Sequence, residues 1–292
     1  MSSRALVTGG AGFIGSHLAD LLLANGWAVT VVDNLCGGDR ANIPPAAEWI
    51  NADVTMTLPG LFGSRTFDAL FHLAGLGAIG PSLQRPAEYM QTNLMGTVRM
   101  LEVARALQVG KFVYAASSCC YGHSAPVPWS ERTPLELDHP YALSKQMGED
   151  AVLHWGRVFG VPVVSLRMFD VYGPRIRAGA FPVFLGQRAR GEPFTVVGDG
   201  EQTRDFVHVS DVVRAYLRAA ESEVTGESFN VGSGQETTIN RLLELLGGGA
   251  RVTLPDRPWE PRRHWADIRK IEQRLAWQPT MSVEQGIADL LR

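Results

Sequence analysis

The sequence predicts an α/β protein in which a doubly wound parallel sheet is accompanied by a smaller, mixed α/β lobe. Short, valine-rich apolar runs alternate with longer helical patterns through the first half of the chain. Apolar runs of this kind are typical of strands that are buried on both faces, as in a parallel sheet covered by helices. After Arg175 the segments shorten and Gly and Pro become frequent, which indicates a looped second lobe.

The elements of the sheet follow one another in chain order. Strands are expected at 5–7, 28–32, 69–73, 111–115 and 161–166, and helices at about 15–25, 87–107 and 141–159. We therefore expect residues 1–173 to form a dinucleotide-binding domain, with a returning strand near 227–232, and residues 174–292 to form a substrate-binding lobe. Ligands of open parallel sheets bind at the carboxyl ends of the strands, so the cleft between the two parts is the expected site.

The composition excludes several classes of protein. The 292 residues carry a net charge of −3, which leaves no excess of basic residues for nucleic-acid binding. We expect no membrane association, because no apolar run reaches the roughly 18 residues of a transmembrane helix and the N-terminus shows no leader pattern. The three cysteines, Cys36, Cys119 and Cys120, suit neither a disulfide framework nor a four-ligand zinc site. We expect a cytoplasmic protein without a metal.

A glycine-rich turn, Thr8–Gly15, joins the first strand to the first helix. Its glycines Gly9, Gly12 and Gly15 have the spacing for a tight turn, a close approach to a diphosphate, and close packing of helix on strand. Any tight strand-to-helix turn can carry such glycines, so the triplet alone is weak evidence. Its position directly after the first strand strengthens the prediction of a Rossmann-type domain.

Asp33 ends the second predicted strand, where a carboxylate can accept hydrogen bonds from the adenosine ribose. Its charge would repel the 2′-phosphate of NADP, so the sequence favours NAD. The alternative interpretation is a turn-forming residue ahead of Asn34. Asp53 is placed to cap the adenine end, or it is simply a polar residue after a strand.

Tyr141 and Lys145 are the candidate chemical centre. Pro140 precedes them, and the spacing i, i+4 places the phenol and the ammonium on one helix face, with Cβ atoms about 5–6 Å apart. A nearby cation lowers the pKa of a tyrosine, so Tyr141 could take a proton from a hydroxyl while hydride leaves for a nicotinamide. Without further motifs, the pair could equally be a surface tyrosine covered by a lysine stem.

Other motifs decide between these interpretations. A serine pair, Ser117–Ser118, follows the strand that ends ahead of Tyr141. With it, the sequence resembles the NAD-dependent epimerase/dehydratase branch of the extended short-chain dehydrogenases/reductases over nearly its whole length. The resemblance extends to His72–Gly75, Asn93–Thr97, Arg167–Arg175, Gly198–Phe206 and Phe229–Gly232.

The resemblance implies NAD as cofactor, a small-molecule nucleotide sugar as substrate, and Ser117, Tyr141 and Lys145 as catalytic residues. The residues that it implies for cofactor binding are Gly9, Gly12, Phe13, Ile14, Gly15, Asp33, Asn34, Asp53, Val54, Leu73, Ala74, Asn93, Tyr141 and Lys145. Those implied for substrate binding are Ser118, Cys119, Asp170, Thr195, Val197, Arg204, Arg257 and Glu260. Among the latter, the two arginines would hold the diphosphate and Glu260 the nucleoside ribose. A homodimer formed by the helices at 87–107 and 141–159 is also implied.

Two positions depart from the family pattern. Asp170 replaces an asparagine, and a carboxylate beside a diphosphate is unfavourable unless it is protonated or paired with an arginine such as Arg175 or Arg177. At the positions of Ser118 and Cys119, dehydratases of the family have an aspartate and a glutamate, respectively. Decarboxylases of the family have the glutamate at the position of Cys119. The missing carboxylates favour a 4-epimerase that acts through a transient 4-keto sugar. The alternatives are a dehydratase that uses the cysteine, or a non-catalytic NAD-binding partner protein.

Overall fold

A seven-stranded, fully parallel sheet forms the centre of the protein, as the computed structural model shows for residues 2–257 and 260–292. In spatial order its strands are β3 (Glu48–Ile50), β2 (Ala28–Val32), β1 (Arg4–Thr8), β4 (Ala69–His72), β5 (Lys111–Ser117), β6 (Val163–Met168) and β11 (Glu227–Val231). The order reverses between β1 and β4, as in doubly wound sheets. The predicted parallel sheet is confirmed, although the sequence analysis missed the short strand β3.

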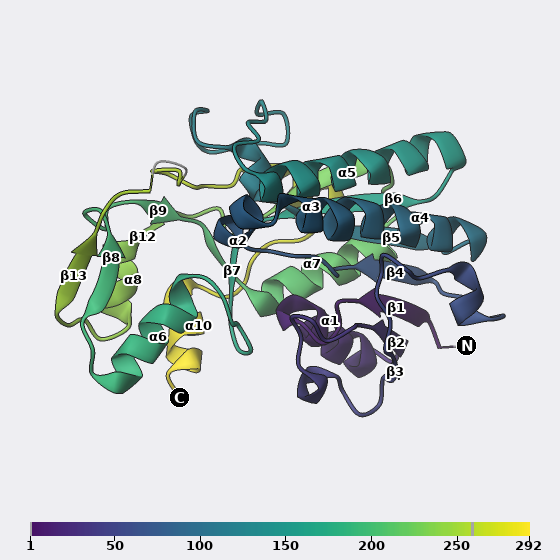
Figure 1. Cartoon of the computed structure of the whole chain (residues 1–292), viewed down its shortest axis with the longest axis horizontal. Helices are drawn as coiled ribbons and strands as arrows, with labels where there is room; N and C mark the ends of the chain where they lie inside the picture. The colour runs from purple at the N-terminus through teal and green to yellow at the C-terminus, as the bar shows by residue number, and fades with distance from the viewer. Residues whose placement is uncertain (1, 258–259) are drawn as a thin grey trace.

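Two layers of helices cover the sheet (Figure 1). The helices α1 (Phe13–Ala24) and α7 (Val209–Glu221) pack on one face, and α4 (Gly96–Ala106) and α5 (Pro140–Phe159) pack on the other. Strand β1 supplies both cores, because Ala5 and Val7 point to the first face and Leu6 points to the second. The helix expected at 87–107 is divided into α3 (Pro86–Tyr89), a π-helical turn η3 (Met90–Met95) and α4.

A smaller lobe lies at the carboxyl end of the strands, on the left in Figure 1. Its elements are β7 (Asp170–Tyr172), α6 (Ala180–Arg190), β8 (Phe194–Val197), β9 (Thr203–Arg204), β10 (Phe206–His208), β12 (Thr237–Thr238), α8 (Ile239–Leu245), β13 (Arg251–Leu254) and α10 (Val283–Leu290). The strands form three two-stranded pairs, and Phe181, Phe184, Phe194 and Leu242 contribute to the core between them and the helices. This is the predicted mixed α/β lobe.

The chain returns from the small lobe to the large sheet. Three elements of the range 174–292 lie on that sheet: α7, the expected returning strand β11, and α9 (Arg269–Leu275), which packs beneath β11. The remaining short elements are η1 (Arg40–Asn42), η2 (Pro59–Phe62), α2 (Ile79–Gln84) and η4 (Ser118–Tyr121). Within the described residues, the helices are all too short or too polar to cross a bilayer.

Candidate active site

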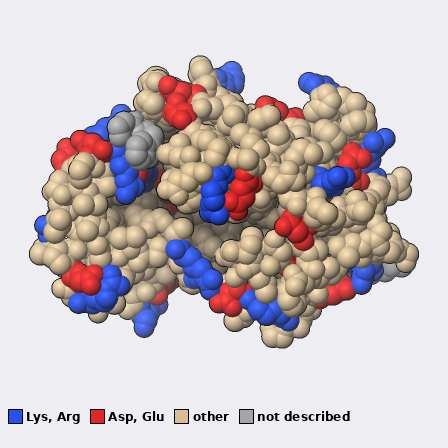
Figure 2. Space-filling model, viewed as in Figure 1, with Lys and Arg blue, Asp and Glu red and all other residues tan. Residues whose placement is uncertain are grey.

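A cleft of about 1420 Å³ runs between the carboxyl edge of the sheet and the small lobe. Figure 2 shows the surface hollowed at this place. The residues predicted for cofactor, substrate and catalysis line the cleft, with Asn93 as the exception. Residues that are up to about 250 positions apart in the sequence, such as Gly9 and Glu260, therefore line one cavity.

The glycine turn is built for a close approach of backbone. Gly9 has φ +73°, and a Cβ on it would lie 2.7 Å from the Ala74 amide nitrogen. A Cβ on Gly15 would overlap the carbonyl oxygen of Gly9, which accepts a hydrogen bond of 3.1 Å from the amide of Gly12. Gly12 caps α1 without a side chain, so the first N–H groups of the helix face the cleft. These groups can receive a diphosphate.

Asp33 lies at the end of β2 and is almost fully buried. Its oxygens accept hydrogen bonds from the amides of Ala11 (2.9 Å) and Leu35 (2.8 Å), which fix the carboxylate at the cleft wall. Each oxygen keeps a second lone pair for a ribose hydroxyl. Beside it, the Asn34 amide donates to Asp53 (3.0 Å), so this end of the cleft is lined with acceptors. Diphosphate donors followed by ribose acceptors fit a dinucleotide.

We expect this arrangement to discriminate between the two nicotinamide dinucleotides. The Asp33 carboxylate would lie beside a 2′-phosphate, so NADP should bind at least about tenfold more weakly than NAD. Fluorescence titration of the purified protein measures both affinities. Asp33→Asn should narrow the difference, and Asp68→Asn, whose carboxylate accepts from the amide of Arg4 away from the cleft, is the control. Equal binding of the two dinucleotides to the unaltered protein would contradict the prediction.

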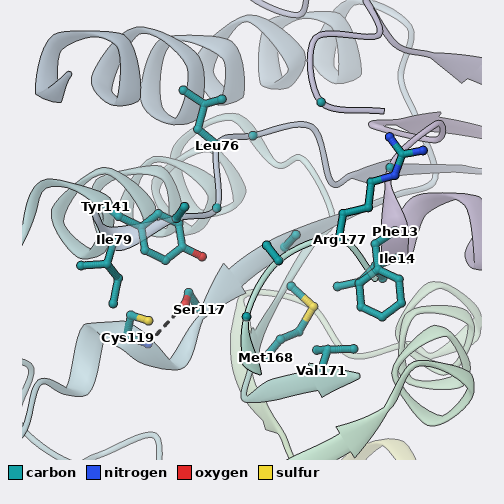
Figure 3. Close-up of a pocket in the computed structure, with 18 of the residues that line it drawn as sticks. Phe13, Ile14, Leu76, Ile79, Ser117, Cys119, Tyr141, Met168, Val171 and Arg177 are labelled. Carbon is teal, nitrogen blue, oxygen red and sulfur yellow. Dashed lines mark hydrogen bonds between the residues drawn. The ribbon is translucent and has the colours of Figure 1, made fainter. Parts of the chain in front are cut away.

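Tyr141 and Lys145 occupy the first turns of α5, as the sequence predicts. The helix begins at Pro140, and the imidazole of His139 accepts a hydrogen bond of 3.0 Å from the amide of Ala142. The ring of Tyr141 stacks on His139, with centroids 6.0 Å apart. Figure 3 shows its hydroxyl pointing toward Ser117, at the end of β5. The Lys145 ammonium is buried, 4.6 Å from the centre of the Tyr114 ring.

The charge of this centre differs from the expectation. Burial raises the pKa of Tyr141 well above its ordinary value, and a hydrogen bond with Ser117 only partly opposes this. Burial also lowers the pKa of Lys145 to about 8, against the attraction of Glu149. The predicted lowering of the Tyr141 pKa is therefore not found in the protein chain by itself, where desolvation by burial is the largest effect on the phenol.

A buried network supports α5 from behind. Glu149 accepts from the Arg167 guanidinium (3.0 Å) and from the Ser165 hydroxyl (2.8 Å), and Arg167 also donates to the hydroxyl of Tyr121 (2.9 Å). Both members of the ion pair are almost fully buried. Their hydrogen bonds join α5 to β6 and fix the helix that carries the candidate catalytic pair.

Asn93 lies behind the cleft wall, in the π-helical turn η3. Its amide donates to the carbonyl of Leu76 (3.0 Å) and to the hydroxyl of Ser144 (2.9 Å), and its oxygen accepts from the amide of Leu76 (2.7 Å). It therefore ties the loop that follows β4 to α5. This geometry suits a positioning role rather than direct contact with a cofactor.

The small lobe contributes charged residues to the cleft. The guanidinium of Arg204 lies 3.0 Å from Glu260, and that of Arg257 lies 2.7 Å from the same carboxylate. Thr195 and Val197 line the cleft from β8, where the Thr195 hydroxyl accepts from Gln187 (2.9 Å). The predicted diphosphate and nucleoside residues thus form one group.

The partner of Asp170 is not an arginine. Arg175 pairs with Asp20 (2.8 Å) and Arg177 pairs with Asp39 (2.6 Å), so both predicted partners are wrong. Asp170 instead lies 2.6 Å from the Nδ1 atom of His264, a cleft residue that the sequence analysis missed. Its position close after Glu260 in a loop-rich segment was the only signal in the sequence.

The thiols beside Ser117 keep their protons. Burial raises the pKa of Cys119 to about 11 and that of Cys120 to about 12. The amide of Cys119 donates to the Ser117 hydroxyl (3.2 Å), and its side chain faces the cleft (Figure 3). A thiol in this state is a poor base at neutral pH, which disfavours the cysteine-dependent dehydratase.

One acidic group at the rim has donors close enough for a cation. His123, Glu136 and Asp138 bring their ligand atoms within 4.8 Å of one another. However, His123 already pairs with Asp138 (2.9 Å), and Glu136 accepts from the hydroxyl of Ser124 (2.9 Å). We assign no metal to this group.

Comparison with known proteins agrees with this geometry. The NAD dependent epimerase/dehydratase family matches residues 5–232. The chain is 35% identical to a UDP-glucose 4-epimerase of Mycolicibacterium smegmatis, over 98% of this chain and 96% of the relative. Among solved structures, the UDP-glucose 4-epimerase of Thermotoga maritima with UDP-glucose is 34% identical, with a TM-score of 0.94 over 99% of this chain and 100% of that one. A dTDP-glucose 4,6-dehydratase of Streptomyces venezuelae with NAD bound is 31% identical, with a TM-score of 0.90 over 98% and 95% of the two chains.

Proposed function

Because the chain belongs to the NAD dependent epimerase/dehydratase family, we propose that it is an NAD-dependent nucleotide-sugar 4-epimerase whose substrate is a UDP-sugar. One observation carries the proposal. Ser117, Tyr141 and Lys145 line one cleft, and the family resemblance places Ser118 and Cys119 where dehydratases have carboxylates. The cleft therefore has the residues needed to oxidise an alcohol but lacks the carboxylates that would assist the elimination of water.

Each group of cleft residues has a separate role in the proposed reaction. The glycine turn and Asp33 would hold NAD, whose nicotinamide would supply a reversible hydride acceptor for C4 of the sugar. Tyr141 takes the proton of the C4 hydroxyl and later gives it back, while the Ser117 hydroxyl orients the same oxygen. Lys145 holds the nicotinamide ribose, and its charge favours the phenolate of Tyr141 during the transfer. Arg204 and Arg257 hold the diphosphate, for which a guanidinium fork is well suited.

Product analysis tests the proposal directly. The enzyme is incubated with UDP-glucose, UDP-GlcNAc and UDP-glucuronate, and the sugars are identified by NMR. We expect the C4 epimer of at least one of them, with no net change in NADH absorbance. Release of water or carbon dioxide as the main reaction would overturn the proposal.

The pKa of Lys145 predicts a fall of activity in alkaline solution. Because burial lowers this pKa to about 8, the ammonium loses its charge as the pH rises through that value. We expect kcat/KM, which reports the free enzyme, to decline above about pH 8. Lys145→Arg, whose guanidinium stays charged, should be slower overall but lack this decline. A rate that rises steadily to about pH 10, where a free phenol ionises, would show that Tyr141 sets the profile instead.

A homodimer is supported by apolar residues on the outer face of α5. Leu143, Met147 and Val158 recur at helical spacing on this helix and are each more than one third exposed. Light scattering after gel filtration should give twice the 31.8 kDa mass of one chain. Replacing Leu143 and Met147 by Glu should shift the protein to the monomer, whereas Val252→Glu, at an exposed apolar position of β13, should not.

The state of the cysteines supports a cytoplasmic location. Cys36, Cys119 and Cys120 all lie within the described residues and are all free. Free thiols, of which Cys36 is exposed, suit a reducing compartment.

A further inference from the structure

Three side chains from distant parts of the chain form a line in the cleft, through one hydrogen bond and one close ionic contact. The Ser118 hydroxyl lies 3.0 Å from the Nε2 atom of His264, and the Nδ1 atom of His264 lies 2.6 Å from the carboxylate of Asp170. Ser118 belongs to η4, Asp170 begins β7, and His264 lies in the segment that returns to the large sheet. All three line the cleft, although Ser118 and His264 are nearly inaccessible.

The histidine is held in place by packing. Its ring contacts Phe169, with centroids 4.7 Å apart, and the edge of Trp129, with centroids 5.2 Å apart. The neighbouring backbone is fixed as well, because the amide of Ala266 donates to Asp205 (3.0 Å) and the amide of Trp129 donates to the carbonyl of Trp265 (2.8 Å). His264 therefore presents its two nitrogen atoms in fixed directions.

Asp170 remains ionised in this setting. Burial raises its pKa, but the charges of His264 and Arg204 and the contact with His264 hold the pKa below its ordinary value. About one third of its side chain stays exposed to the cleft, whereas His264 lies behind it. An ionised carboxylate can only accept hydrogen bonds, whereas the amide of an asparagine at this position could also donate them.

The carboxylate lies close to the reacting end of the sugar. His264 links it to Ser118, which stands between Ser117 and Cys119 in the sequence. Figure 3 shows Cys119 beside Ser117 and below Tyr141. A sugar whose C4 hydroxyl reaches Tyr141 thus has a fixed negative charge near its other substituents.

We propose that Asp170 determines sugar specificity, accepting hydrogen bonds from a neutral sugar and repelling a sugar that carries a carboxylate, and that His264 and Ser118 are its positioning residues. The proposal rests on the proposed function, because it assumes that a nucleotide sugar occupies this cleft. The enzyme then prefers UDP-hexoses over UDP-uronates. The like charge of a uronate raises the cost of binding beside Asp170.

Substrate preference in matched variants tests this proposal. For the intact enzyme and Asp170→Asn, kcat/KM is measured at about pH 7.5 with UDP-glucose and UDP-glucuronate, and the dissociation constants are measured by calorimetry. We expect Asp170→Asn to raise the glucuronate-to-glucose ratio about tenfold or more, mainly through KM, because one charge is removed at close range. Asp199→Asn is the control, since it removes an exposed carboxylate of the same lobe, outside the cleft.

A second variant, His264→Gln, should change the glucuronate-to-glucose ratio in the opposite direction. In His264→Gln the amide can still reach Ser118 and Asp170, but the imidazole, which would offset the charge of the carboxylate when protonated, is removed. We expect discrimination against UDP-glucuronate to increase, whereas a purely structural role of His264 would lower thermal stability and leave the ratio unchanged. If Asp170→Asn and His264→Gln both keep the intact enzyme's ratio, the proposal is overturned.

The binding data separate this proposal from the proposed function. If no C4 epimer forms but the dissociation constants shift as expected, the epimerase function fails and the specificity proposal stands. If epimers form but neither the rate ratio nor the binding ratio changes in the variants, only the specificity proposal fails. If neither UDP-sugar binds the intact protein, a sugar beside Asp170 is excluded and both fail.

Discussion

Replacing Tyr141 by phenylalanine should lower the rate of epimerisation about 10²- to 10⁴-fold, the usual contribution of one general acid–base group. The change removes only the hydroxyl that points toward Ser117 (Figure 3). The ring still stacks on His139, so the fold and the affinity for NAD should be unchanged. The rate is measured by NMR on the UDP-sugar that the intact enzyme turns over, and NAD binding is measured by fluorescence.

Tyr89→Phe is the matched control. Tyr89 packs edge-on against Tyr141, with centroids 6.2 Å apart, and its hydroxyl donates to the carbonyl of Ala78 (2.7 Å). The variant loses a hydroxyl in the same neighbourhood but outside the cleft lining, so it should cost about 1 kcal/mol of stability and little activity. If Tyr141→Phe and Tyr89→Phe have the same small effect on the rate, Tyr141 is not the acid–base group. That outcome would favour the non-catalytic NAD-binding protein.

Gly15→Ala should weaken the binding of NAD strongly. The added methyl group would overlap the carbonyl of Gly9, which already accepts from Gly12 and cannot retreat without opening the turn. The first N–H groups of α1 would then no longer point toward the diphosphate. Losing one hydrogen bond to a charged group, about 1.5–3 kcal/mol, lowers the affinity about 10- to 100-fold.

The NAD released from the purified protein on denaturation measures this effect, together with a titration of the added cofactor. Gly60→Ala serves as the control, because a Cβ at that position has no neighbour within 4 Å among the described residues and no positive φ to strain. Thermal melting shows whether Gly15→Ala still folds. A folded Gly15→Ala protein with a full complement of NAD would contradict the role of the turn.

The features that were predictable depend on short stretches of sequence. The turn Thr8–Gly15 fixes a strand, a tight reversal and a helix start within eight residues, because the glycines permit conformations that other residues resist. The spacing of Tyr141 and Lys145 places both on one face of α5, since residues four apart are neighbours on any α-helix. Alternation of apolar runs and helices predicted the parallel sheet, which is confirmed. The chemical roles of the cleft residues remain predictions.

Features that depend on distant residues could not be predicted in this way. His264 meets Asp170 and Ser118 only because the chain returns along Trp129 to the large sheet, and nothing in the local sequence indicates this path. For the same reason, the expectation of an arginine partner for Asp170 was wrong.

By itself, the sequence determined the type of sheet, the glycine turn and the placement of the phenol and the ammonium on one helix face. Each of these features follows from the conformational limits of a few consecutive residues. The tertiary structure alone decided which side chain contacts Asp170, that Asn93 lies behind the cleft, and that burial raises the pKa of Tyr141. The physical reason is that solvent exposure and charge partners depend on which remote segments pack together. Short-range spacing therefore indicates the chemistry, while long-range packing sets its strength and selectivity.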